Sequence, residues 1–129
     1  MNFTAMTTKR MITYFDGDVK LINHALKVYG FAKAIAELEG ITGDVLKVIE
    51  ISAILHDIGI KESERKYAST AGKYQEIEGP PVTEDILREF NLDHNFVDRI
   101  KFLIGNHHSY DKIDGIDFQV LVEADLLVN

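Results

Sequence analysis

The fold is decided by one short stretch, Ile51-Ser52-Ala53-Ile54-Leu55-His56-Asp57-Ile58-Gly59. An apolar run of helical character ends there in adjacent His56 and Asp57, and Gly59 follows. Two ionisable side chains at the end of a buried helix are costly to bury unless something neutralises them, and a bound metal ion does so. Neighbouring residues of a helix point about 100° apart, so both can reach one ion only where the helix is ending. We expect Gly59 to occupy the C′ position of that helix.

The segments on either side of this stretch carry apolar residues at helical spacing, and no segment alternates with period two. Start and stop signals predict six helices. In the first half of the chain, these are a helix to Phe15 capped by Thr7 or Thr8, a helix to Glu39 opened by Asp16 or Asp18, and a helix from Thr42 or Asp44 to His56. In the second half, they are a helix from Val82 to Phe90, a helix capped by Asp93 with His107-His108 at its end, and a last helix containing Phe118, Leu121, Val122 and Asp125. The sequence therefore predicts an all-α fold, a single domain over residues 1–129 with its core over 18–129, built as a bundle of about six helices.

Residues 59–79 show no sustained periodicity and combine charged with small residues, so we expect a long irregular loop. Pro80-Pro81 would then set the start of the next helix, since proline is tolerated in a first turn. A loop of this length inside a compact domain is usually functional. It carries a surplus of positive charge, with the cations Lys61, Arg65, Lys66 and Lys73. They either receive phosphate oxygens or lie on a solvated surface.

Composition excludes several classes of protein. The chain has 129 residues, a formal net charge of −7 and no cysteine, so disulfides and thiolate metal sites are absent. The negative charge argues against a nucleic-acid polymer as partner. No apolar stretch is long enough for a signal sequence or a membrane span. We therefore expect a cytoplasmic protein without a membrane partner.

Four predicted helices each place a histidine or a carboxylate in phase with, or at the end of, their apolar faces. These residues are His24, His56-Asp57, His107-His108 and Asp125, whereas His94 is expected at the surface. Taken singly, each could be a buried side chain hydrogen-bonded to a neighbour; together they predict a metal centre. Mixed imidazole and carboxylate ligands suit divalent Fe, Mn, Co, Ni or Zn. One or two ions are expected, with Asp57 able to bridge them.

The order of these residues resembles the HD-domain superfamily of metal-dependent phosphohydrolases, in which a His, a His-Asp pair and a distant Asp lie on a helical bundle. The resemblance covers residues from about 18 to the C-terminus and rests on three strings, Asn23-His24-Ala25-Leu26-Lys27-Val28, Leu55-His56-Asp57-Ile58-Gly59 and Glu123-Ala124-Asp125. It implies that His24, His56, Asp57 and Asp125 bind one metal ion.

Some relatives, including the HD-GYP phosphodiesterases of cyclic dinucleotides, hold two or more ions and have a pair like His107-His108. That branch has Lys directly after its His-Asp-Ile-Gly string, where this chain has Ile60, and its Gly-Tyr-Pro signature is missing here. Cyclic dinucleotides are therefore not the expected substrates. Where several relatives have a further His, this chain has Glu78, either a ligand of a second ion or a helix-start carboxylate.

The leading hypothesis is hydrolysis of a phosphate ester of a small phosphorylated molecule by metal-activated water. Asp57 would bind metal and accept a proton, and Lys61 or Arg65 would stabilise developing negative charge. One alternative is a di-iron oxygenase of the same fold, which some HD-domain proteins are. Another is a non-catalytic, metal-containing ligand-binding module.

Overall fold

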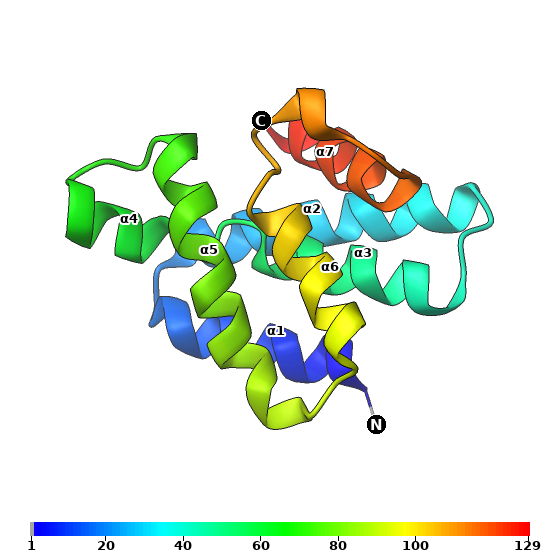
Figure 1. Ribbon diagram of the computed structural model, residues 1–129, viewed down its shortest axis with the longest axis horizontal. Coiled ribbons are helices and arrows are strands. Elements are labelled where there is room, and N and C mark those ends of the chain that lie inside the picture. The colour runs from blue at the N-terminus through cyan, green and yellow to red at the C-terminus, as the bar shows by residue number, and fades with distance from the viewer. Residues whose placement is uncertain (1) are drawn as a thin grey trace.

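The computed structural model describes residues 2–129, and these residues form an all-α bundle (Figure 1). The helices are α1 (Phe3–Phe15), α2 (Val19–Leu38), α3 (Gly43–Leu55), α4 (Ile60–Tyr67), α5 (Gly72–Leu87), α6 (His94–Ile104) and α7 (Ile116–Val128), with short 3-10 turns at Arg88–Phe90 and Tyr110–Lys112. Within this described part of the chain there is no strand. The all-α prediction is confirmed, with one helix more than expected.

Helix α3 lies at the centre of the bundle and packs against α1, α2, α6 and α7 (Figure 1). Every residue from Val48 to Leu55 is buried. A helix that is apolar on nearly all sides requires neighbours on all sides, and this one has them. The consequence for the site is that His56, just after the end of α3, is buried in the protein, whereas Asp57 beside it is half-buried.

Three of the predicted helix starts agree with the structure, at Asp18, Thr42 and Asp93, and the first one does not. Asp18 accepts a hydrogen bond from the backbone of Leu21, and Asp93 caps α6 in the same way. Helix α1 instead begins at Phe3, capped by Asn2, so the prediction of Thr7 or Thr8 as its cap is wrong. Both threonine hydroxyls donate to carbonyls four residues earlier. This backward bond lets threonine sit inside a helix.

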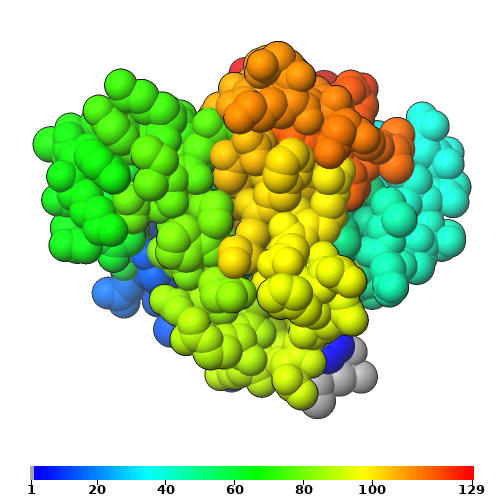
Figure 2. All heavy atoms as spheres, viewed as in Figure 1, coloured from blue at the N-terminus to red at the C-terminus, as the bar shows by residue number. Residues whose placement is uncertain are grey.

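The expected irregular loop over residues 59–79 is also wrong, because most of it forms α4 and the start of α5. Pro80 and Pro81 lie inside α5 and do not begin a helix. The missing periodicity has a physical cause: the first half of α5, from Gly72 to Gly79, packs by close approach of its glycine backbone and not through large apolar side chains. A Cβ at Gly79 would lie 2.7 Å from a methyl carbon of Ile104 on α6. Figure 2 shows α5 pressed against α6, with α4 on the outer side of α5.

Gly59 serves a different purpose from the one expected. Its φ of −80° is right-handed, so it is not a left-handed C′ residue, and it precedes α4 as its N-cap. Glycine is required at this position because a larger side chain would not fit. A Cβ there would lie 2.6 Å from the backbone nitrogen of Gly79 and 2.8 Å from the carbonyl oxygen of Gln75. The turn that carries the His-Asp pair therefore touches the backbone of α5 directly.

The C-terminal third agrees with the prediction except at one boundary. Helix α6 ends at Ile104, and His107 and His108 lie in the turn that follows instead of in its last turn. Helix α7 carries Asp125 as expected. None of the helices in residues 2–129 combines the length and the apolar character needed to cross a membrane.

Candidate metal centre

The histidines and aspartates singled out from the sequence meet at one place in the bundle. His24 lies on α2, His56 and Asp57 follow α3, and Asp125 lies on α7. Helices α2, α3 and α7 pack against one another, which brings residues far apart in the sequence into contact. His94 is elsewhere, exposed and paired with Asp98.

A first ligand group consists of His24, His56, Asp57 and Asp125. Nε2 of His24 lies 3.1 Å from Nε2 of His56, 3.3 Å from Oδ2 of Asp57 and 3.3 Å from Oδ1 of Asp125. Nε2 of His56 lies 3.3 Å from the same Asp57 oxygen and 3.5 Å from that of Asp125. Donor atoms bound to one ion at about 2.1 Å are roughly 3.0 Å apart at right angles and roughly 3.4 Å apart at the tetrahedral angle. These separations fit one divalent ion held by His24, His56 and Asp57, with Asp125 beside both histidines.

The orientation of the His56 ring also suits metal binding. Its Nδ1 lies 2.7 Å from the carbonyl oxygen of Ala53, one turn earlier in α3. In the neutral ring, donation of the Nδ1 proton to that carbonyl leaves Nε2 with its lone pair directed at the ligand group. Such bonds hold ligand histidines in one tautomer and one orientation. His107 repeats the arrangement, with Nδ1 2.7 Å from the carbonyl oxygen of Ile104.

A second ligand group consists of Asp57, His107 and His108, with one ligand atom of each within 4.8 Å of the others. Oδ1 of Asp57 lies 3.2 Å from Nε2 of His107. Because Oδ2 of the same carboxylate belongs to the first ligand group, Asp57 faces both groups with different oxygens. A carboxylate placed in this way can bridge two ions.

The charges in this centre favour a cation. Burial by itself would lower the pKa of His56, but the carboxylates of Asp57 and Asp125 outweigh it and raise that pKa to about 10. Burial would likewise raise the pKa of both aspartates, but the pKa of Asp57 lies well below its ordinary value because of His56 and His107. Hydrogen bonds from His24 and His56 do the same for the pKa of Asp125. These two ionised carboxylates, one buried and one half-buried, can be neutralised by a bound metal ion.

Glu78, expected as a further ligand, makes other contacts and belongs to neither ligand group. Its buried carboxylate accepts hydrogen bonds from Lys66 Nζ at 2.8 Å and from Tyr67 Oη at 3.0 Å. The bond from Lys66 is the main reason that the pKa of Glu78 is lowered. Its role as a metal ligand stays a prediction.

The four cations expected to receive phosphate lie on α4 and at the start of α5 and are engaged with other groups. Lys61 Nζ donates to the carbonyl oxygen of Tyr14 at 2.8 Å, and Arg65 pairs with Glu62. Lys73 lies over the ring of Tyr74. Their role in substrate binding also stays a prediction.

Sequence reasoning missed the residues that hold His108. They lie on one face of α5, at Gly72, Gln75 and Glu76. Together with Gly79 they follow the helical spacing of i, i+3, i+4 and i+7. This spacing of small and polar residues was the available sign of a helix face, but it contains no apolar stripe and therefore does not predict a buried face.

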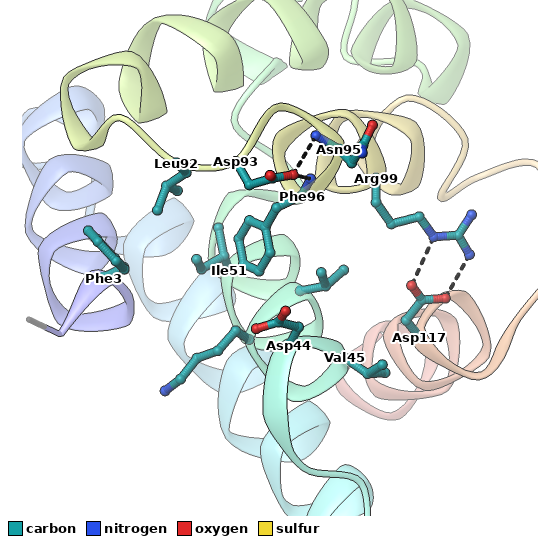
Figure 3. A pocket seen from close by; sticks show the side chains of 12 residues that line it. Phe3, Asp44, Val45, Ile51, Leu92, Asp93, Asn95, Phe96, Arg99 and Asp117 are labelled. Atoms are coloured by element: carbon teal, nitrogen blue, oxygen red, sulfur yellow. Dashed lines mark hydrogen bonds and ion pairs between the residues drawn. The ribbon is translucent and has the colours of Figure 1, made fainter.

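A separate hollow of about 530 Å³ lies between α1, α6 and the N-terminal half of α3 (Figure 3). Its floor is apolar and includes Phe3, Ile51 and Phe96. At its edge, Arg99 binds the carboxylate of Asp117. No residue of either ligand group lines it, so it is distinct from the metal centre.

The family comparison agrees with this geometry. The family model of the HD domain matches residues 21–127, which include every member of both ligand groups. The chain belongs to the HD domain family, whose members are generally metal-dependent hydrolases. No curated protein and no solved structure matched the chain.

Proposed function

We propose that this HD-domain protein is a metal-dependent phosphohydrolase that cleaves a phosphate ester of a small molecule. One observation carries the proposal: His24, His56, Asp57 and Asp125 converge from three packed helices with donor separations of 3.1–3.5 Å. They do so in the order that the family uses. Neither a polymeric nucleic acid nor a membrane is needed as partner.

The first ligand group would hold the ion through Nε2 of two histidines and one oxygen of each aspartate. A divalent ion held there would lower the pKa of a bound water and polarise the phosphoryl oxygen. Asp57 contributes more than ligation, because its Oδ1 is turned away from the first group. That oxygen can accept a proton from the attacking water and share it with His107 Nε2, 3.2 Å away.

Lys61 and Arg65 are the proposed source of positive charge for the transition state. Both lie on α4, which begins directly after the turn that carries His56 and Asp57. Their present partners, Tyr14 and Glu62, are contacts at or near the surface. Such contacts contribute little free energy, so exchanging one for a phosphoryl oxygen costs little.

The test is elemental analysis of the purified protein, followed by a screen of nucleotides and other phosphate esters with the metal found. Release of phosphate or of a phosphomonoester by the wild type, lost in His56→Ala, would support the proposal. Asp98→Asn, on the surface of α6, is the matched control. Oxygen consumption by an iron-loaded protein without ester cleavage would favour the oxygenase, and metal without any turnover would favour the binding module.

A further inference from the structure

His108 is held by α5 through three contacts of different kinds. Gly72 leaves room for its ring, since a Cβ there would lie 2.9 Å from Cγ of His108. Glu76 accepts a hydrogen bond from the backbone nitrogen of His108 at 3.1 Å and another from the hydroxyl of Ser109. Gln75 meets the ring itself, with Oε1 3.4 Å from Nε2. One helix face therefore positions both the backbone and the ring of this residue.

The amide of Gln75 has only one workable orientation. Gln75 is 8% exposed, and its Nε2 donates to the carbonyl oxygen of Thr70 at 2.6 Å. A carbonyl oxygen only accepts hydrogen bonds, so the amide nitrogen must face Thr70 and the amide oxygen must face His108. That oxygen is also only an acceptor. A hydrogen bond across the 3.4 Å between this oxygen and Nε2 of His108 therefore requires the proton to be on that nitrogen.

We infer that Gln75 is a positioning residue that holds His108 as the Nε2–H tautomer, so that His108 offers Nδ1 to the second ligand group. A neutral imidazole has one protonated nitrogen and one lone pair, and a metal takes the lone pair. The inference rests on the proposed function in that it concerns an ion bound beside the first one.

His107 and His108 then present opposite nitrogens although they are adjacent in the sequence. His107 donates Nδ1–H to the carbonyl of Ile104 and faces Asp57 with Nε2. His108 donates Nε2–H to Gln75 instead. Adjacent residues in a turn cannot approach one ion along the same direction. With different tautomers, His107 can face the ion with Nε2 and His108 can face it with Nδ1. Gln75 thus does for His108 what the helix carbonyl does for His107.

The tautomer can be read in the metal-free protein by correlating ring protons with ring nitrogens in ¹⁵N-labelled samples at about pH 8, above the ordinary histidine pKa. A His108→Gln variant assigns the signals. We expect His108 to show protonated Nε2 in the wild type, where the amide oxygen of Gln75 faces the ring. Gln75→Leu should lose this preference. Protonated Nδ1 at His108 in the wild type would overturn the inference.

Calorimetric titration with Zn²⁺ tests the consequence for binding. Gln75→Leu should weaken the second equivalent by about 10- to 100-fold, as loss of a partner behind a ligand histidine does, and leave the first equivalent unchanged. Gln119→Leu, the same substitution on α7, is the matched control and should change neither. Equal affinities in Gln75→Leu and wild type, or a wild type that binds a single ion, would overturn the inference. Neither result touches the proposed hydrolysis, which needs only the first group and is measured by the ester screen.

Discussion

The two ligand groups differ in how the chain builds them. The first group is carried by α2, α3 and α7, which pack together in the core. The second takes His107 and His108 from a turn after α6, and α5 supports them through Gly72, Gln75 and Glu76. Asp57 alone belongs to both. The first group is therefore held by burial of apolar surface and the second by a few polar contacts and close backbone approaches.

The largest effect is expected from Asp57→Asn, because both groups share this carboxylate. The variant should bind no metal equivalent, and kcat/KM should fall by more than about a thousandfold, or roughly 4 kcal/mol of transition-state stabilisation. Elemental analysis and the ester assay measure this. A variant that retained one full equivalent would show that the groups do not depend on a common ligand.

His56→Ala and His107→Ala separate the two groups. His56→Ala should lose the first ion and with it the activity, whereas His107→Ala should lose only the second. Stabilisation by added metal, about 2.7 kcal/mol at a hundredfold excess over Kd, should shrink in both variants when thermal unfolding is followed. Identical ion counts in His107→Ala and wild type would contradict the second group. Glu78→Gln belongs to this series: loss of an ion would make Glu78 a ligand, and an unchanged count would leave it as partner of Lys66 and Tyr67.

Gly59→Ala changes the close contact between the turn after α3 and the backbone of α5, and it removes no ligand. The added Cβ would meet the backbone of Gly79 and Gln75, and we expect a loss of about 1–3 kcal/mol in the free energy of unfolding. Gly30→Ala is the control, because nothing lies within 4 Å of its Cβ; in the middle of α2 it should gain about 0.5–1 kcal/mol. Urea unfolding measures both. Equal stability of Gly59→Ala and wild type would show that the backbone of α5 can shift to make room for the added Cβ at little cost in free energy.

Lys61→Ala should have a smaller effect, confined to the rate. If Lys61 reaches the transition state, kcat and kcat/KM should fall together by about tenfold, with metal content unchanged. Lys20→Ala, on the exposed start of α2, provides the comparison. A wild-type rate in Lys61→Ala would leave this lysine as the link between α4 and the carbonyl of Tyr14.

The smallest effect concerns the link between α6 and the start of α7. Arg99 binds Asp114 and Asp117. Burial alone would raise the pKa of Asp117, but Arg99 outweighs it and holds that pKa below its ordinary value. A lowered folded-state pKa stabilises the protein above about pH 4 and ceases to do so as pH falls through it. The stability difference between wild type and Arg99→Met, measured in urea, should therefore shrink as the pH falls below about 4; a constant difference would contradict this.

Most of the first group could be predicted, because its signals are local. The capping residues Asp18 and Asp93 and the apolar stripes of α2, α3, α6 and α7 all lie within single helices. His24, His56 and Asp125 stand in phase with those stripes, so their inward direction follows from the 3.6-residue period. The placement of α4 and α5 could not be predicted in this way. Gly72 and Gly79 pack by backbone approach, which leaves no apolar pattern, and the two prolines mimic a helix start.

By itself, the sequence determined the all-α class and the central buried helix, and it singled out the histidines and aspartates of the first group as candidate ligands, since helical period, caps and ligand chemistry are properties of short segments. Only the tertiary structure decided which oxygen of Asp57 faces which group and which partner each cation contacts. It also decided that Gln75 meets His108. All of these contacts depend on distances between residues far apart in the chain, and no local sequence pattern encodes such distances. They are also sensitive to small changes, since one added Cβ at Gly59 or Gly72 would create a clash.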